Sequence, residues 1–197
     1  MIADFANREI VLASASPRRV DLLRQIGIEP IVFPVNVKED EQLDSSNPGR
    51  LACANAELKA RAAYEINPVP GSIIIGADTI VVQKGRLFGK PADEAEAAWM
   101  LSTLSGQPHD VYTGICLIDA ASGKTVYGSR RTAVHFAKLS DQEIEQYVAT
   151  GEPLDKAGAY GIQGMGGLLV EEIAGDYGTV VGLSLPLLKK LARMLFY

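Results

Sequence analysis

Two arginines begin a predicted helix at a place where acidic residues would be stabilising. The stretch "LASASPRRVDLL", residues 12–23, has the pattern of a strand end, a turn of small residues and a helix start. A helix N-terminus carries partial positive charge and unpaired N–H groups, so Arg18 and Arg19 break a local rule. Small residues such as Ser14 would let a phosphate approach the backbone, where the N–H groups and the arginines would bind it. The alternative is two exposed arginines whose cost is tolerated.

A single carboxylate interrupts the apolar stretch "IIIGADTIVV", which predicts a buried strand. An ionised Asp78 at this position must be paired, hydrogen-bonded or bound to a metal, because burying it alone is costly. In a functional role it would hold Mg²⁺ or activate water; otherwise it would cap a β-bulge marked by Gly76. The residues favour function for Asp78, whereas Thr79 beside it simply suits a strand.

Three lysines and one glutamine lie in short stretches that could bind a ligand. Lys59 lies in "ELKARA", Lys90 in "FGKP" and Lys156 in "LDKAG". Each is more often a solvated charge, although the last two lie among turn residues, where binding groups concentrate. The stretch "GAYGIQGMGG" has the glycines of a phosphate loop, but a strand pattern follows it and no P-loop motif occurs in the chain. The amide of Gln163 could read a base edge, although a solvated loop glutamine is the simpler interpretation.

The acidic run "VKEDEQ" and the histidines give weaker signals. An acidic run is usually solvated, but Mg²⁺ needs only one or two carboxylates in addition to substrate phosphates. His109 stands alone in "SGQPHDVYTG" and is interpreted as structural. With two histidines and no paired ligand spacing, the sequence argues against a zinc site. No Ser-His-Asp or Cys-His set has a spacing that indicates nucleophilic catalysis.

Composition limits the class of protein. The 197 residues suffice for one domain or two small lobes, and the net charge of −5 argues against a general nucleic-acid binder. The first residues do not have the pattern of a signal peptide, and no apolar run reaches the about 18 residues of a membrane span. Cys53 and Cys116 form no C-x-x-C pair and are expected to be buried thiols. We therefore expect a cytoplasmic protein with neither nucleic-acid nor membrane partners.

The segments that must position these residues mix strand–helix units with hairpins. This mixture predicts an α/β fold with a mixed sheet rather than a purely parallel one. The predicted strands are residues 9–15, 30–35, 72–83, 84–88, 110–120, 125–139, 157–164, 167–175 and 180–185. The predicted helices are residues 17–26, 48–64, 92–106, 140–151 and 186–197.

Taken in order, these stretches resemble the Maf family of nucleoside triphosphate pyrophosphatases. The matching motifs are "LASASPRR", "ELKARA", "GADTIVV", "FGKP", "LSGQPHDVYTG", "GEPLDKAGAYGIQG" and "VVGL". They run from Leu12 to Leu183, nearly the whole chain. The chain is most similar to the branch that acts on dTTP and UTP, which carries "SPRR", "GADT" and "DKAGAYGIQG", and less to the branch that acts on 7-methyl-GTP.

The resemblance implies hydrolysis of a nucleoside triphosphate to the monophosphate and pyrophosphate, by metal-dependent attack of water at the α-phosphorus. The cofactor would be a divalent cation, Mg²⁺ or Mn²⁺. The implied fold is the Maf/ITPase-like α/β architecture, a mixed sheet with flanking helices and two lobes around a central cleft. Residues 1–197 would form a single domain, and a homodimer is expected.

The resemblance also implies roles for individual residues. Asp78 would be the catalytic general base toward water and a metal ligand. The positions that set base specificity are Arg18, Thr79 and Gln163. The residues that hold the triphosphate are Ser14, Arg19, Lys59 and Lys90.

Two further positions depend on details of the resemblance. Glu39 would assist catalysis or bind the metal, as counting from Gly27 supports, but Glu41 is near enough for a loop shift to exchange them. In "VVGLSL", Ser184 replaces the proline of the family pattern. We expect Ser184 to cap the last helix without loss of activity.

A glutamine amide both donates and accepts, so Gln163 suits the O4 and N3–H groups of uracil and thymine. Admitting the 5-methyl group discriminates by only ~1–3 kcal/mol, so both dTTP and UTP should be cleaved. Three alternatives remain open. They are a house-cleaning pyrophosphatase for damaged purine nucleotides, a nucleotide-binding regulator of cell division with little catalysis, and a non-specific phosphatase that releases orthophosphate.

Overall fold

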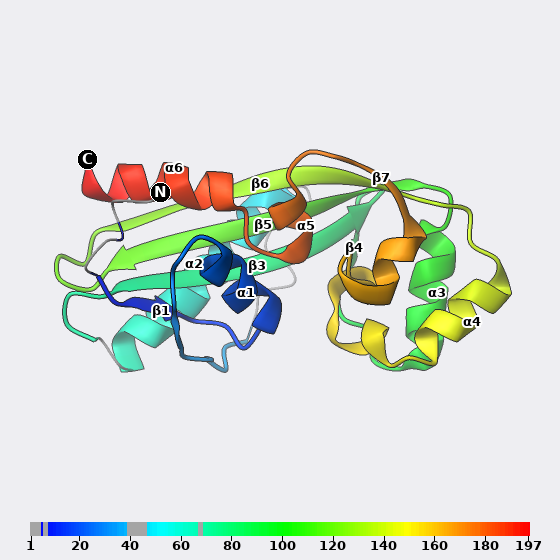
Figure 1. Ribbon diagram of the computed structural model, residues 1–197, viewed down its shortest axis with the longest axis horizontal. Helices are drawn as coiled ribbons and strands as arrows, with labels where there is room; N and C mark the ends of the chain where they lie inside the picture. The colour runs from blue at the N-terminus through cyan, green and yellow to red at the C-terminus, as the bar shows by residue number, and fades with distance from the viewer. Residues whose placement is uncertain (1–4, 6–7, 39–46, 67–68) are drawn as a thin grey trace. The chain divides into compact units, whose positions relative to one another are not determined.

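The computed structural model describes residue 5 and residues 8–38, 47–66 and 69–197. Within these residues, seven strands form one mixed sheet in the order β2-β1-β3-β5-β6-β7, with β4 paired to β3 outside this path (Figure 1). Helices flank the sheet, so the predicted α/β class is confirmed. The strands are β1 (Ile10–Leu12), β2 (Ile31–Val32), β3 (Ile73–Gln83), β4 (Arg86–Phe88), β5 (Pro108–Asp119), β6 (Thr125–Phe136) and β7 (Val170–Ala174).

The chain divides into two compact units. Unit 1 comprises the described residues up to Asp78 together with Thr113–Arg130 and Gly182–Tyr197. Unit 2 comprises Thr79–Tyr112 and Arg131–Val181. The predicted division into two lobes matches these units, whereas the cleft and the single-domain assignment stay predictions.

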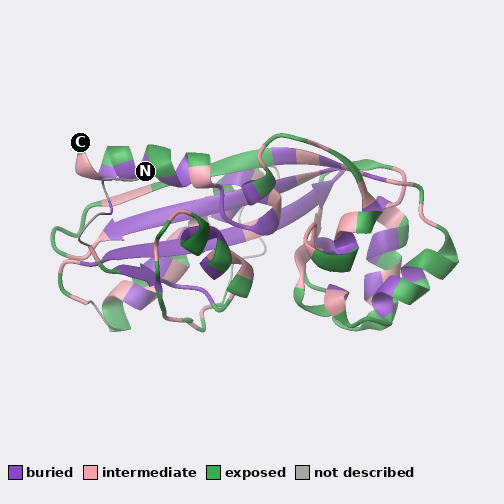
Figure 2. Ribbon diagram, in the orientation of Figure 1, coloured by how far each residue is buried: buried purple, intermediate pink, exposed green. Residues whose placement is uncertain are grey.

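Unit 1 is built on parallel strands. β1 pairs in parallel with both β2 and β3, and Leu12 lies opposite Ile75. β3 is buried along nearly its whole length (Figure 2). Ile73, Ile74 and Ile75 are fully buried, as their run of β-branched apolar residues predicts for a central strand. The helices of unit 1 are α1 (Pro17–Gln25), α2 (Pro48–Ile66) and α6 (Leu185–Phe196).

The alanine-rich helix α2 packs unusually close to the sheet. Its buried face carries Ala52, Ala56 and Ala60. A Cβ atom at Gly76 of β3 would overlap the carbonyl oxygen of Ala56, and one at Gly114 of β5 would overlap that of Ala52. Small residues on both surfaces therefore allow the helix backbone to lie directly on the strands, which fixes where the α2 side chains lie.

Helix α6 lies along β6 (Figure 1). Leu187 and Leu191 of α6 pack over Gly128 of β6. A Cβ at Gly128 would contact their methyl groups. Ser184 caps the helix, because its side chain accepts a hydrogen bond from the backbone N–H of Leu187 at 3.3 Å. The capping role expected for Ser184 is confirmed.

Unit 2 has its own hydrophobic core beneath helices α3 (Glu94–Leu104) and α4 (Asp141–Val148). Helix α4 begins with the predicted capping box, since Ser140 and Glu143 exchange side-chain-to-backbone hydrogen bonds. In the core, His109 Nε2 lies 2.8 Å from the hydroxyl of Tyr160, and the His109 ring meets the Phe136 ring edge-on. His109 is 3% exposed, and burial lowers its pKa to about 4. The structural interpretation of this histidine is confirmed.

Two segments predicted to be strands are not strands. Residues 157–164 contain the 3₁₀-helix η3 (Ala157–Ala159), and residues 180–185 contain the end of the short helix α5 (Tyr177–Val181) and the start of α6. Glycines at positive φ break the extended chain, with φ of 71° at Gly158 and 68° at Gly164. Two further 3₁₀-helices are η2 (Glu152–Asp155) and η4 (Gly164–Leu169). Because η4 takes up the first residues of the strand predicted over 167–175, β7 is shorter than that prediction.

Both cysteines are free thiols, as expected; Cys116 is buried as predicted, whereas Cys53 is only half-buried. Burial raises the pKa of Cys116 to about 12. Within the described ranges, each helix is too short or too polar to cross a membrane.

Candidate active site

The carboxylate of Asp78 lies against two side chains of α2. Alternation along β3 places Asp78 on the same face as Gly76, where α2 packs. Lys59 Nζ lies 2.7 Å from Asp78 Oδ1, and Asn55 Nδ2 lies 3.2 Å from Oδ2. Asp78 is 5% exposed, so this pairing supplies what a buried carboxylate requires. The prediction that Asp78 must be paired or hydrogen-bonded is confirmed.

Asn55 is a site residue that the sequence analysis did not identify. It is 4% exposed and lies four residues before Lys59, so the two side chains share one face of α2. The signal was a polar residue on the apolar, alanine-rich side of a helix, in "ACANAELKA". With one donor on each carboxylate oxygen, Asp78 is held in a single orientation.

The turn between β1 and α1 brings Ser14 and Arg19 together. Arg19 Nη1 donates to Ser14 Oγ at 2.9 Å, and Arg19 Nε donates to the carbonyl oxygen of Gly182 at 2.9 Å. Ser14 Oγ also accepts from the backbone N–H of Ser16, the N-cap residue, whose own side chain makes no capping bond. The Arg19 guanidinium therefore links the turn that follows β1 to the turn that precedes α6. The first turn of α1 has no acidic residue, as its sequence shows.

Ser14 follows β1, and Asp78 lies within the neighbouring parallel strand β3. Leu12 pairs with Ile75, and Ser14 and Asp78 follow these residues by two and three positions. The carboxyl ends of parallel strands face one edge of a sheet, which is where ligands bind in open α/β folds. The N-terminus of α1 and the paired carboxylate thus both lie just beyond the paired residues of β1 and β3, in the direction of the strands' carboxyl ends. Arg18, half-buried, lies in the first turn of this helix.

The other predicted site residues of the described chain belong to unit 2. Thr79 follows Asp78 in β3 and is half-buried, and Lys90 is exposed just after β4. Gln163 is half-buried and is the N-cap residue of η4. Their assignment to a nucleotide site stays a prediction.

The structure describes one of the predicted metal ligands. Asp78 lies within the described residues, whereas Glu39 and its alternative Glu41 lie outside them. Among the residues that the structure describes, no group of three or more His, Cys, Asp or Glu side chains is arranged to hold a metal. A metal here would need further oxygen ligands from the substrate, as Mg²⁺ commonly does.

Comparisons with known proteins match this chain over nearly its full length. A family model described as "Maf-like protein" matches residues 9–195. A dTTP/UTP pyrophosphatase of Symbiobacterium thermophilum is 48% identical, over 90% of this chain and 89% of that protein. Those of Dictyoglomus thermophilum and Thermococcus gammatolerans are 44% and 48% identical, over 96% and 95% of this chain and 97% of each relative.

A solved structure gives only a weak match. The crystal structure of a nucleoside-triphosphatase, a dITP/XTP pyrophosphatase from Mycobacterium abscessus, aligns with a TM-score of 0.41 and 18% identity. The alignment covers 66% of this chain and 75% of that one. A likeness at this level supports no conclusion about the substrate or the chemistry of this chain.

Proposed function

Because the chain belongs to the Maf family, we propose that it hydrolyses dTTP and UTP to the nucleoside monophosphate and pyrophosphate. The observation that carries the proposal is the Asp78 carboxylate, which is 5% exposed and accepts hydrogen bonds from Lys59 and Asn55. The three relatives named dTTP/UTP pyrophosphatase support the same substrates.

Asp78 is proposed to act as the general base. Water that attacks the α-phosphorus must lose a proton, and a positioned carboxylate can accept it. Pyrophosphate then leaves on the side opposite the attacking oxygen. Lys59 and Asn55 each bond one carboxylate oxygen, so the base keeps one orientation without rearranging during the reaction.

The triphosphate is proposed to bind Ser14, Arg19, Lys59 and Lys90. The N-terminus of α1 offers backbone N–H groups and partial positive charge, and the absence of acidic residues in its first turn leaves room for an anion. Arg19 is held in place through Gly182, so its guanidinium does not need to be ordered by the substrate.

A divalent cation, Mg²⁺ or Mn²⁺, is part of the proposal. Asp78 fits such an ion, because a carboxylate offers about four lone-pair sites and one bond from each α2 side chain leaves others. Glu39 would be the second carboxylate, with substrate phosphates completing the ligands. When bound, the ion screens the phosphate charge.

The base is proposed to be read by Arg18, Thr79 and Gln163. An amide matches the O4 and N3–H groups that uracil and thymine share. A site that admits the 5-methyl group distinguishes the two bases by only ~1–3 kcal/mol, so both substrates are cleaved. A cytoplasmic location, a homodimer and the lack of nucleic-acid or membrane partners stay predictions.

A nucleotide panel tests the proposal. The purified protein is incubated with Mg²⁺ or Mn²⁺ and each common nucleoside and deoxynucleoside triphosphate, together with ITP and 7-methyl-GTP. Pyrophosphate and orthophosphate are assayed separately. We expect pyrophosphate from dTTP and UTP, and a chelator should abolish its release.

Each of the other outcomes would point to a different function. Pyrophosphate from purine nucleotides alone would indicate a house-cleaning enzyme for damaged purines. Orthophosphate release would indicate a non-specific phosphatase. Nucleotide binding without turnover would indicate a regulator.

A further inference from the structure

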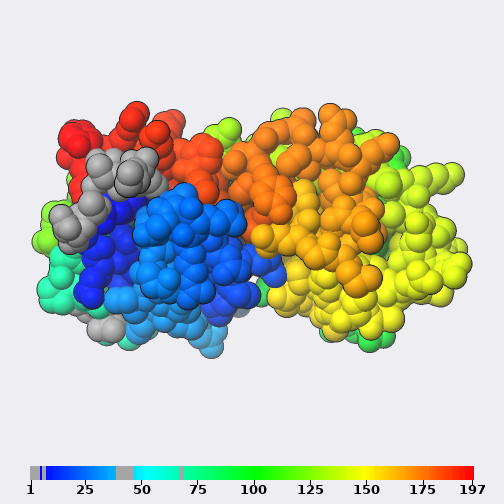
Figure 3. All heavy atoms as spheres, in the orientation of Figure 1, coloured from blue at the N-terminus to red at the C-terminus, as the bar shows by residue number. Residues whose placement is uncertain are grey.

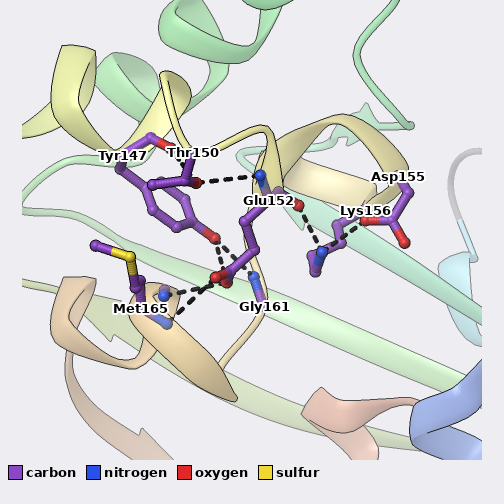
Figure 4. Close-up of polar contacts among 8 residues, drawn as sticks. Tyr147, Thr150, Glu152, Asp155, Lys156, Gly161 and Met165 are labelled. Carbon is purple, nitrogen blue, oxygen red and sulfur yellow. Dashed lines mark hydrogen bonds and ion pairs between the residues drawn. The ribbon is translucent and has the colours of Figure 1, made fainter.

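The glycine-rich segment 161–167, which carries Gln163, is fastened to one carboxylate (Figure 4). Glu152 Oε2 accepts a hydrogen bond from the backbone N–H of Met165 at 3.2 Å. Glu152 Oε1 accepts one from the backbone N–H of Gly166, also at 3.2 Å. Hydrogen bonds to an ionised acceptor are stronger than neutral ones. The backbone just after Gln163 is therefore tied to η2.

Tyr147 of α4 ties down the backbone before Gln163. Its hydroxyl donates to Glu152 Oε1 at 2.9 Å and accepts from the backbone N–H of Gly161 at 3.3 Å. Tyr147 is 3% exposed, and burial together with the neighbouring Glu152 raises its pKa, so the hydroxyl keeps its proton and remains a donor. One connected pair, Tyr147 and Glu152, thus holds the chain on both sides of Gln163.

The carboxylate is itself anchored. The backbone N–H of Glu152 donates to Thr150 Oγ1 at 3.1 Å, and this hydroxyl donates to the carbonyl oxygen of Tyr147 at 2.6 Å. The ammonium group of Lys156 donates to the Glu152 carbonyl oxygen and lies 2.6 Å from Asp155 Oδ1 (Figure 4). These hydrogen bonds restrict movement of the Glu152 backbone, so its side chain stays in place if segment 161–167 shifts.

Segment 161–167 needs these hydrogen bonds to stay ordered because it is rich in glycine. Glycine loses more conformational entropy on ordering than any other residue, and this segment is largely glycine. The orange part of unit 2 reaches the surface in Figure 3. Within segment 161–167, Gly164 and Met165 are exposed. A Cβ at Gly166 would overlap the carbonyl oxygen of Gly161, so this path of the chain also requires that glycine.

We propose that Glu152 and Tyr147 are positioning residues for base selection, holding the backbone on both sides of Gln163 so that its amide meets uracil or thymine in one place. This inference rests on the proposed function. Cytosine presents a donor where uracil presents O4, and an acceptor where uracil presents N3–H. An amide free to move and rotate can satisfy either base, whereas a fixed amide can discriminate between them.

The test compares Glu152→Gln and Tyr147→Phe with Glu145→Gln. Glutamine at position 152 keeps the size of the side chain but turns one carboxylate oxygen into an NH₂ group that faces another donor. Glu145 is exposed on α4 and serves as the matched control. The readout is the ratio of kcat/KM for UTP to that for CTP. Lost stability lowers both rates equally and leaves this ratio unchanged.

We expect Glu152→Gln to lower the ratio about tenfold, Tyr147→Phe to lower it by a smaller factor, and the control to leave it unchanged. Amide hydrogen exchange at Gly161, Met165 and Gly166 should accelerate in Glu152→Gln, which checks the fastening without any turnover. If Glu152→Gln does not fold, Tyr147→Phe carries the test, because it keeps the carboxylate.

The two proposals fail in different ways. A wild-type protein that prefers UTP, with Glu152 and Tyr147 variants that keep the wild-type ratio, would overturn the positioning role and leave the proposed function standing. A wild-type protein with no preference for uracil and thymine nucleotides would overturn the proposed function, and the positioning role with it.

Discussion

Lys59 Nζ lies 2.7 Å from Asp78 Oδ1, in a pair whose side chains are 13% and 8% exposed. The pair joins the helix α2 to the strand β3, and Asn55 bonds the second carboxylate oxygen. Removing one member of a pair that is largely buried leaves the other charge without its partner. Variants of Asp78 must therefore be tested for folding and for catalysis separately.

Asp78→Asn should fold but lose most turnover. Asparagine has the size of aspartate, and the flexible stem of Lys59 can carry its ammonium group toward water. Loss of a general base typically lowers kcat by about 10²–10⁴-fold. Steady-state kinetics with dTTP measure the loss, circular dichroism checks the fold, and Asp21→Asn, an exposed change on α1, is the control. Near-normal kcat in Asp78→Asn would remove Asp78 from the mechanism.

Gly76→Ala should destabilise the protein and impair catalysis together. The added Cβ would overlap the carbonyl oxygen of Ala56, so α2 must move and carry Lys59 away from Asp78. Overpacking of this kind costs about 1–3 kcal/mol, or more when backbone is displaced. Urea unfolding measures the cost.

Gly89→Ala is the control for this stability measurement. A Cβ at Gly89 would meet no atom within 4 Å. We expect its free energy of unfolding to change by less than about 0.5 kcal/mol. Equal free energies of unfolding for Gly76→Ala and Gly89→Ala would contradict the prediction, because they would show that α2 can be displaced from β3 without loss of stability.

Features with local causes could be predicted from the sequence. The strand over residues 72–83 matches β3, because a run of buried β-branched residues needs no distant partner to be recognised. The Ser140 capping box and the Ser184 cap depend on spacings of three residues. The need of Asp78 for a partner follows from the cost of burying charge, although the sequence could not identify that partner.

Features that depend on contacts between distant segments could not be predicted. Asn55 and Asp78 are 23 positions apart, and nothing in the stretch around either residue indicates the other. The strand predicted over residues 157–164 is wrong, because the glycines that break it are also common in sheet turns. The role of Glu152 depends on backbone N–H groups 13 and 14 positions away, which every sequence supplies.

Ser184→Ala should destabilise the protein by about 1 kcal/mol without changing kcat. Its hydroxyl caps α6, is fully buried and satisfies the N–H of Leu187. Loss of a helix cap costs ~0.5–2 kcal/mol. Urea unfolding measures the change against Ser102→Ala, an exposed serine within α3 whose replacement should be nearly neutral. An unchanged free energy of unfolding in Ser184→Ala would contradict the capping role.

Acid should destabilise the protein through His109. Burial lowers its folded-state pKa from 6.5 to about 4, so only the unfolded chain binds this proton between these values. Stability is therefore complete above pH 6.5 and is lost as pH falls toward 4, by roughly 2 kcal/mol between pH 7 and pH 5. Urea unfolding at these two pH values should show this loss in the wild type and not in His109→Gln, whose amide can still bond Tyr160. The difference between the two proteins isolates His109, because every other titrating group is common to both. Equal losses in the two proteins would show that His109 takes up its proton without unfolding.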